Sequence, residues 1–399
     1  MTESGTRSFG VLGIGLVWFG AAVSVAEILT GSLIAPLGFG QGMLAIIVGH
    51  LIGGALMFAM SYIGGRFESP AMKSTAVSFG EKGAGIFASL NVIQLVGWTA
   101  IMILMGATAA SQLFTGVPFW AWTIIIGALI ALWLLVQVGG LTALNAVAGA
   151  ALFILTIIIS GPLFVGVSEI AVVDPAAMTF GSAVEMSVAM PLSWLPLVAD
   201  YTHRSKKPLA SSLTATLVYG FASIWMFAIG LAGALQTGQM DVVAILGASG
   251  LFVPAAIVVV LSTVTTTYLD AYSAGVSAEA ISPKLTARTF GVVVTAIGVV
   301  IALTVADVTI MESFLYLIGS VFAPMVAVLI SDVFLIRKDS RGQRFDAVSL
   351  GVWVVGVIIY RILLPFMTPI GITVPTILLV MVINVIVRAI VSRKEAPHA

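Results

Sequence analysis

The chain has 399 residues, of which 60% are hydrophobic and 9% charged, with 17 basic and 17 acidic side chains. So few polar side chains cannot cover the surface of a water-soluble protein of this length, so soluble enzymes and soluble binding domains are excluded. The absence of cysteine excludes disulfides and thiolate chemistry. With no net charge and no basic tract, a nucleic-acid partner is not expected, and the expected partner is a lipid bilayer.

Apolar runs of 18 to 28 residues follow one another along the chain and match the length of a membrane-spanning helix. None shows the alternation of a barrel strand, so the sequence predicts an all-α membrane protein with twelve transmembrane helices. The first run lacks a basic segment and a small-residue cleavage site, and we expect it to be a retained helix and not a signal peptide. The expected spans are 11–35, 41–64, 84–112, 118–137, 143–166, 180–201, 208–235, 250–278, 287–306, 311–336, 347–366 and 371–392.

The basic residues predict the orientation. Sixteen of the seventeen Lys and Arg residues fall at the termini or at even-numbered connections, and Arg361 is the exception. Because positively charged loops are retained in the cytoplasm, we expect a multi-pass protein of the cytoplasmic (inner) membrane with both termini inside.

The first expected span carries a carboxylate near its centre. Glu27 lies in an otherwise uncharged apolar stretch, close to Val23, Ser24 and Gly31. A carboxylate at that depth costs about 3 kcal/mol on insertion scales, which makes it a functional-site hypothesis. Three roles are open for it: a substrate acceptor, a proton carrier, or a structural carboxylate held by backbone donors at a helix break.

The sixth expected span is also interrupted, by Pro191 and Pro196 around Ser193 and Trp194. Proline frees a backbone carbonyl, which hydrocarbon tolerates only where the backbone lines a cavity. Paired broken helices in two halves indicate a transporter built from inverted repeats, with its site near the membrane midplane.

Spacing supports two repeats within a single transporter domain, 1–399. Ser24 and Trp98 are 74 residues apart, and Ser193 and Thr266 are 73 apart. We expect repeat one at 11–166, repeat two at 180–336 and two extra helices at 347–392. An odd number of spans from one break to the other gives the halves opposite orientations.

Asn91, Gln94 and Trp98 recur on one face of the third span. An aromatic ring beside two amides can stack on a flat heterocycle while the amides bond its edge. The alternatives are an interfacial aromatic belt and amides that join helices. Trp98 lies about fourteen residues into its span, too deep for a belt, which favours stacking.

The eighth span carries five hydroxyl side chains within six residues. Those of Ser262, Thr265 and Thr266 share a face, and with first-span carbonyls near Phe19 and Ala22 they could replace the water around a small hard cation. Sodium is the natural candidate for such a metal site. The alternative is that each hydroxyl bonds the preceding turn of its own helix.

Five other polar residues have simpler interpretations. For Asp270, ion exit and a structural hydrogen bond are equally open. Asp200, Asp332 and His203 lie at predicted span ends, where solvation or helix capping is expected, and His50 is expected to be a buried, hydrogen-bonded histidine. No HExxH, P-loop or GxSxG pattern is present, so neither an enzyme nor a cofactor is expected, and a membrane-embedded lipid enzyme is a remote alternative.

Four segments carry a family resemblance: FGAAVSVAEILTGSLIAPLGF, IQLVGWTAI, MPLSWLPLVADYTHR and TVTTTYLDAYSAG. They resemble nucleobase cation symporter family 1, the group of cytosine permease and the hydantoin transporter, and the likeness covers the whole chain. EILTGSLIAP with MPLSWLPLVADYT is similar to the CytX branch, whose members transport hydroxymethylpyrimidine, a thiamine precursor. The resemblance implies a leucine-transporter-type fold, with ten helices in two inverted repeats, two C-terminal helices and sodium-coupled alternating access.

The resemblance also implies residue roles. Trp98 would stack on the base with Gln94 beside it, and the sixth-span break would contact substrate around Ser193. The implied sodium ligands are Phe19, Ala22, Thr265 and Thr266.

The chain departs from its relatives at three positions. Pro191 stands where they have an aromatic residue, which leaves Trp194 as the candidate second stacking ring, and Ser262 stands where they have a base-reading asparagine. These changes weaken the transfer of cytosine or hydantoin specificity. Glu27 is an added feature that suits an exocyclic amine through a charge-assisted hydrogen bond.

The sequence therefore predicts a secondary transporter that imports a small aminopyrimidine, expected to be hydroxymethylpyrimidine, by sodium symport. A proton-coupled carrier that uses Glu27, and a permease for cytosine or another nucleobase, are the alternatives. The expected substrate residues are Val23, Ser24, Glu27, Asn91, Gln94, Trp98, Ser193, Trp194 and Ser262, and the last of these is also a candidate sodium ligand with Phe19, Ala22, Thr265 and Thr266.

Overall fold

The computed structural model describes residues 10–136, 141–167, 177–248, 250–305 and 310–395, whose regular structure is helical. Eight of the described helices are long and apolar enough to span a bilayer, and a bent pair makes a ninth. Each of the twelve expected spans falls on a helix or a helix pair. The long helices are α3 (Gly38–Arg66), α6 (Glu81–Leu113), α7 (Phe119–Val136), α8 (Leu141–Leu163), α9 (Phe180–Trp194), α11 (Pro208–Thr237), α13 (Phe252–Ile281), α14 (Ala287–Thr304), α15 (Ile310–Ile330), α16 (Ala347–Leu363) and α17 (Thr373–Glu395).

Shorter elements complete the chain order. They are α1 (Val11–Ala22), α2 (Val25–Leu33), η1 (Ala35–Leu37), α4 (Ala71–Ser74), α5 (Ala76–Phe79), α10 (Val198–Thr202), α12 (Val242–Ala248) and the π-helical η4 (Ser331–Ile336).

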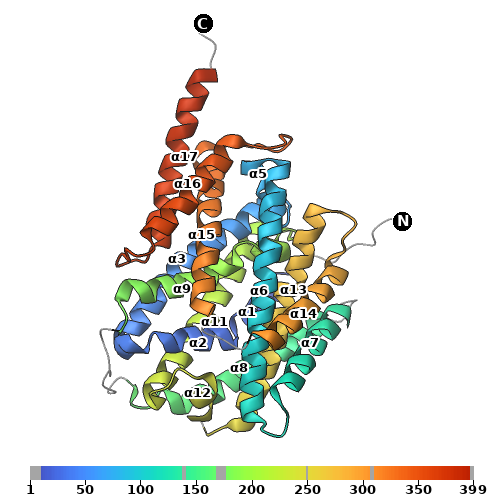
Figure 1. The fold of residues 1–399 in the computed structure, drawn as a ribbon, viewed down its shortest axis with the longest axis vertical. Helices are drawn as coiled ribbons and strands as arrows, with labels where there is room; N and C mark the ends of the chain where they lie inside the picture. The colour runs from blue at the N-terminus through green and yellow to red at the C-terminus, as the bar shows by residue number, and fades with distance from the viewer. Residues whose placement is uncertain (1–9, 137–140, 168–176, 249, 306–309, 396–399) are drawn as a thin grey trace.

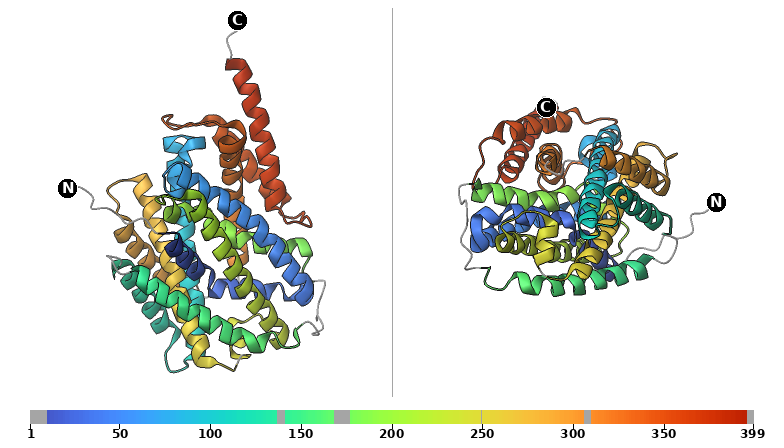
Figure 2. Two further views of the ribbon diagram at one scale, coloured as in Figure 1. Left: turned by 180° about the vertical axis from the view of Figure 1, so that it is seen from behind. Right: turned by 60° about the horizontal axis from the view of Figure 1, so that its bottom comes forward.

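The helices pack in two main groups (Figure 1). In one, α6 and α13 pack against each other and against α7 and α14. In the other, α11 packs on α1, α2 and α3, and α9 packs on α3. α8 contacts members of both groups, while α15, α16 and α17 pack together along one edge of the bundle (Figure 2).

Both expected helix breaks are present. α1 ends at Ala22 and α2 begins at Val25, and the two axes differ in direction by 53°. Ser24 caps α2 by accepting a hydrogen bond from the Glu27 N–H at 3.2 Å. The motif Ser-x-x-Glu is a typical helix start, so the sequence also contained the signal for where this break lies.

The second break separates α9 from α10. α9 ends at Trp194 and α10 begins at Val198, with Pro196 between them. The Pro196 carbonyl accepts a hydrogen bond from Asn91 Nδ2 of α6 at 3.1 Å. The carbonyl exposed by the break therefore has a partner, as hydrocarbon surroundings require.

Two glycines bring α2 and α11 into backbone contact. A Cβ added to Gly230 would lie 1.9 Å from the Ile28 carbonyl oxygen, and one added to Gly31 would lie 2.2 Å from the Phe227 carbonyl oxygen. Both are far inside van der Waals contact. Glycine is therefore required at both positions for this approach of the two helices.

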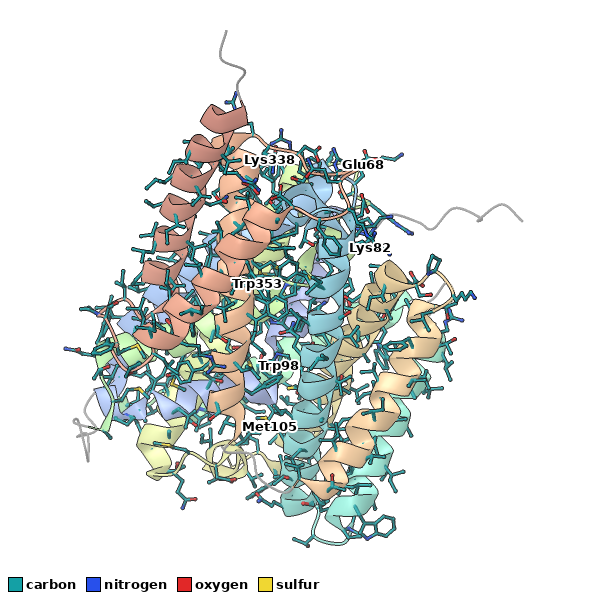
Figure 3. All side chains as sticks on the ribbon, turned by 45° about the horizontal axis from the view of Figure 1, so that its top comes forward. Glu68, Lys82, Trp98, Met105, Lys338 and Trp353 are labelled. Atoms are coloured by element: carbon teal, nitrogen blue, oxygen red, sulfur yellow. The ribbon has the colours of Figure 1, made fainter. Side chains whose placement is uncertain are left out.

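The connections expected on one side of the membrane gather at one end of the molecule, where Glu68, Lys82 and Lys338 lie (Figure 3). The segment 337–346 docks there on the α5–α6 turn. The N–H of Ser340 donates to the Val77 carbonyl at 2.7 Å, and the N–H of Asp346 donates to the Phe79 carbonyl at 3.0 Å.

Asp346 anchors this segment. It caps α16 by accepting from the Ser349 N–H at 3.0 Å, and it also bonds Lys338, Ser340 and Arg388. Burial raises the pKa of its carboxyl, but the hydrogen bonds from Lys338, Ser349, Arg388 and Ser340 outweigh burial and lower the pKa to about 2. Lys338, which lies in the connection between α15 and α16, therefore forms an ion pair with Asp346.

A buried carboxylate that the sequence did not single out joins α9 to the last two helices. Glu185 accepts from Tyr360 Oη at 3.0 Å, from the backbone N–H groups of Ile372 and Thr373 at 2.8 and 3.0 Å, and from Thr373 Oγ1 at 2.6 Å. An acidic group that binds the N–H groups at a helix start is favourable. Glu185 therefore fixes the beginning of α17 against α9.

The three residues expected at span ends, Asp200, His203 and Asp332, have three different environments. Asp200 caps α4, because it accepts from the Ala71 N–H at 2.9 Å, as expected. His203 Nδ1 contacts the Ala199 carbonyl at 2.8 Å. Asp332 is neither solvated nor a cap; it is fully buried and accepts from Asn384 Nδ2 at 2.8 Å, because α17 covers it.

Candidate functional site

A small internal cavity lies between the two helix breaks. Its volume is about 20 Å³, room for about one water molecule. A six-membered ring can enter only if the surrounding helices move apart. The cavity is lined by Ser24, Ala26, Glu27, Trp98, Met102, Met190, Ser193, Trp194, Thr266 and Asp270.

Trp98 lies midway along α6 and forms one wall of the cavity (Figure 3). It is 5% exposed, and among the described residues its indole N–H has no hydrogen-bond partner. Phe314 meets the ring edge-on at 5.5 Å between centroids. The ring and its free N–H are thus placed where a flat ligand would meet them, and the neighbour on the same helix face is Met102.

Trp194, at the end of α9, is the second aromatic wall. Its indole N–H donates to Tyr219 Oη at 3.0 Å, and its ring packs edge-on against Trp18 at 5.4 Å. Unlike Trp98, it is therefore fixed in orientation by other side chains.

Glu27 reaches the cavity but is already bonded on both oxygens. Tyr219 Oη donates to Oε1 at 2.7 Å, and Ser223 Oγ lies 2.9 Å from Oε2. Both partners are side chains of α11, and not the backbone donors that the sequence suggested. Each carboxylate oxygen has a further lone pair, so these bonds do not exclude an additional donor from a ligand.

Asp270 is the cavity residue whose importance the sequence underestimated. It lies on α13 and is 4% exposed, and none of the described residues forms a hydrogen bond or ion pair with its carboxylate. Buried carboxylates normally have partners. The signal in the sequence was its spacing, one turn after Thr266 on the same face.

The two amides of α6 do not line the cavity. Asn91 Nδ2 donates to the Pro196 carbonyl and, at 2.8 Å, to Ser277 Oγ, so it joins the second break to α13. Gln94 Nε2 donates to Asn91 Oδ1 at 2.7 Å, and its buried Oε1 has no described partner. In this structure the two amides join helices, which was the alternative to a substrate-binding role.

Three other expected substrate residues also differ from the expectation. Ser193 lines the cavity, but its hydroxyl donates to the Ala189 carbonyl at 2.8 Å. Val23 is buried and faces a separate apolar cavity of about 440 Å³, together with Phe153 and Trp225. Ser262 bonds the Val259 carbonyl of its own helix at 3.3 Å.

Between the α1 carbonyls and the α13 hydroxyls of the expected ion site, the structure shows one direct hydrogen bond. Thr266 Oγ1 donates to the Gly20 carbonyl at 3.2 Å. The Phe19 carbonyl instead accepts from the Val23 N–H at 3.1 Å, and among the described hydrogen bonds of Thr265 and Thr266 none is to Ala22. Thr265 bonds Leu261 of its own helix at 3.0 Å, although it lines a small cavity with Gly20.

The described residues contain no group of three or more His, Asp or Glu side chains able to hold a metal ion. The donors available between α1 and α13 are hydroxyls and backbone carbonyls. Oxygen donors of this kind fit a hard monovalent cation better than a transition metal.

A large vestibule opens at the end of the molecule that carries the α3–α4 connection. Its volume is about 990 Å³, and its charged lining residues are Glu68, Lys73, His203, Arg204, Lys206 and Glu279. Tyr201 of α10 is bonded to α13, because its hydroxyl donates to the Leu269 carbonyl at 3.1 Å and accepts from Ser273 Oγ at 3.2 Å. It lies between Trp194 and His203 along the chain.

Two broken helices that meet at an internal cavity within a bundle of apolar helices define a membrane transporter and not an enzyme. The family model for "Permease for cytosine/purines, uracil, thiamine, allantoin" matches residues 5–344. The chain belongs to this family.

Curated relatives and solved structures agree with this assignment. Cytosine permease of Escherichia coli K12 is 25% identical over 336 residues, which cover 82% of this chain and 79% of the relative. Purine-cytosine permease FCY2 of Saccharomyces cerevisiae is 24% identical over 87% of this chain and 72% of its own. Mhp1, a nucleobase-cation-symport-1 family transporter solved in a closed conformation with bromovinylhydantoin bound, superposes with a TM-score of 0.81 at 20% identity, over 97% of this chain and 94% of Mhp1.

The expected fold is confirmed: the protein has the leucine-transporter-type architecture that Mhp1 has. The helices α16 and α17 follow this core at the C-terminal end. The expected family is confirmed as well. The hydroxymethylpyrimidine branch and sodium coupling remain predictions.

Proposed function

We propose that this protein imports a small aminopyrimidine, with hydroxymethylpyrimidine as the preferred substrate. Relatives named for cytosine and purines, and a solved relative with a hydantoin bound, support a flat nitrogen heterocycle. In this proposal the ring stacks on Trp98 in the cavity between the breaks. The residue ranges 11–166 and 180–336 act as the two inverted repeats, with 347–392 outside them.

The observation that carries the choice of an amino-substituted ring is the carboxylate of Asp270. In this proposal Asp270 and Glu27, which both line the cavity, are ionised when substrate is bound, and an ionised carboxylate only accepts hydrogen bonds. An exocyclic amine donates to them, whereas a carbonyl at the same position of the ring would place an acceptor against an acceptor. Asp270 has no described partner of its own, so it is the main amine acceptor and Glu27 the secondary one.

We propose sodium as the coupling ion, held between α1 and α13. Thr266 and the Gly20 carbonyl are in contact, and Thr265 lines the adjacent cavity. A cation between them would accept lone pairs from the same oxygens and replace the hydrogen bond that now joins the helices. Ion binding then stabilises the first break against α13, where the substrate cavity lies.

We propose that the end with the vestibule faces the cytoplasm. The Lys- and Arg-containing connections gather there, consistent with retention of positive loops inside the inner membrane. In this proposal substrate is released to the cytoplasm through the vestibule.

Thermal unfolding of the purified protein tests the proposal. Hydroxymethylpyrimidine, cytosine and uracil are each added in sodium and in potassium, and the expected result is stabilisation by hydroxymethylpyrimidine in sodium alone. Trp98→Ala should abolish the shift, while Trp120→Ala, which changes a tryptophan that is 59% exposed, should keep it. Equal shifts in potassium contradict the sodium assignment, and a larger shift with uracil contradicts the amine assignment.

A further inference from the structure

A chain of hydrogen bonds leads from the cavity into the packing of α2, α3 and α11. Glu27 Oε2 lies 2.9 Å from Ser223 Oγ, and Ser223 Oγ lies 2.6 Å from His50 Nε2. On the other oxygen, Tyr219 joins Glu27 to Trp194. All five side chains are buried. Ser223 and His50 are buried and do not line the cavity, so the hydrogen atoms between them and their described partners can be counted.

The other nitrogen of His50 must carry a hydrogen. Nδ1 lies 2.9 Å from the Ile46 carbonyl oxygen, which can only accept, and 2.8 Å from Ser187 Oγ. Ser187 directs its own hydrogen to the same carbonyl at 2.7 Å. Both neighbours of Nδ1 are therefore acceptors, which fixes Nδ1 as a donor.

Ser223 has one hydrogen but two neighbours that accept when Glu27 is ionised and His50 is neutral. In that state one of the two contacts places a lone pair against a lone pair. The network is satisfied only when one more proton is present, either on Glu27 Oε2 or on His50 Nε2. The two arrangements hold the same number of protons and differ by transfer through Ser223.

We propose that Glu27, Ser223 and His50 form a buried site that binds one proton, and that this proton is linked to occupancy of the substrate cavity. The titratable groups that face the pair from neighbouring helices are Tyr219 of α11 and Asp270 of α13, which lines the same cavity. Loss of the proton leaves one buried hydrogen bond unmade.

The link to substrate rests on the proposed function. An amine that donates to Glu27 favours the ionised carboxylate and so places the proton on His50. The ligand therefore competes with a proton on Glu27, and its affinity should rise as pH increases through the pKa of the pair.

Nitrogen-15 NMR of histidine-labelled protein in lipid tests the site without any ligand. His203→Gln and His398→Gln remove the other two histidines, so one residue gives the signal. Between pH 5 and 10 the wild-type network should lose one proton. In Glu27→Gln the amide donates to Ser223, which donates to His50, so His50 should stay neutral with a hydrogen on Nδ1 throughout.

Two results overturn the proposal: a His50 titration that is the same in Glu27→Gln, or a wild-type His50 that is neutral at every pH beside an ionised Glu27. Ser223→Ala is the second variant. It removes the bridge, so the proton should no longer be shared and His50 should titrate with its own pKa.

Substrate affinity measured against pH tests the link. His50→Gln should change the pH dependence of the affinity, because Glu27 then has no histidine to share its proton, and His203→Gln should leave it unchanged. An unchanged profile in His50→Gln refutes the link. If the protein binds no pyrimidine at all, the proposed function fails, while the NMR titration still decides whether the proton site exists.

Discussion

Replacement of Asp270 by asparagine tests whether this carboxylate binds the ligand or stabilises the fold. The side chain is 4% exposed and lines the cavity with Trp98. None of the described residues donates a hydrogen bond to it. Asp270→Asn keeps the volume and replaces a carboxyl group to which no described residue forms a hydrogen bond.

The variant should therefore bind an aminopyrimidine more weakly and yet be no less stable. A hydrogen bond to a charged group contributes about 1.5–3 kcal/mol, so the loss of affinity should be about 10- to 100-fold. Stability without ligand should stay about equal, because the substitution removes no hydrogen bond that a described residue makes to this side chain.

Equilibrium binding of labelled hydroxymethylpyrimidine and thermal unfolding of the ligand-free protein measure the two quantities on one preparation. Asp339→Asn is the matched control, because it removes the same charge from a side chain that is 43% exposed. Unchanged affinity would refute the role of Asp270 as an amine acceptor. A large fall in ligand-free stability would show that its carboxylate has a partner in the fold.

Three further changes have defined outcomes. Tyr219→Phe removes a hydroxyl that both donates and accepts in the buried network, and should lower the free energy of unfolding by about 2–4 kcal/mol, measured by denaturation in detergent. Thr266→Val removes the donor to Gly20 and should abolish sodium-dependent stabilisation, whereas Thr263→Val, whose hydroxyl bonds its own helix, should retain it. Asp346 has a lowered pKa of about 2, so its stabilising effect is complete above about pH 4 and lost as pH falls from 4 toward 2. The unfolding temperatures of wild type and Asp346→Asn should therefore converge across that window, and a constant difference would contradict the assignment.

The sequence predicted the features that depend on local composition. Apolar runs gave the spans, and interruptions gave both breaks, because a chain inside hydrocarbon has few alternatives to helix. Trp98, which the sequence singled out by its depth and its helix face, lines the cavity, and its stacking role stays a prediction. Glu27 was identified as special for the same reason.

The sequence could not supply pairings between distant segments. Glu27 bonds Tyr219 across 192 residues, and Glu185 bonds Thr373 across 188. Helical periodicity tells which residues share a face but not which face of another helix it meets. For this reason Asn91 and Gln94 were assigned to substrate although they join helices, and Asp270 was left undecided although it lines the cavity.

The close approach of α2 and α11 at Gly31 and Gly230 leaves no room for one helix to slide along the other. If the helices move during transport, we expect these two segments to move together. Bending is then expected at 23–24, where the axes of α1 and α2 already differ by 53°. A substitution that stiffens the backbone there should slow transport without changing any ligand contact.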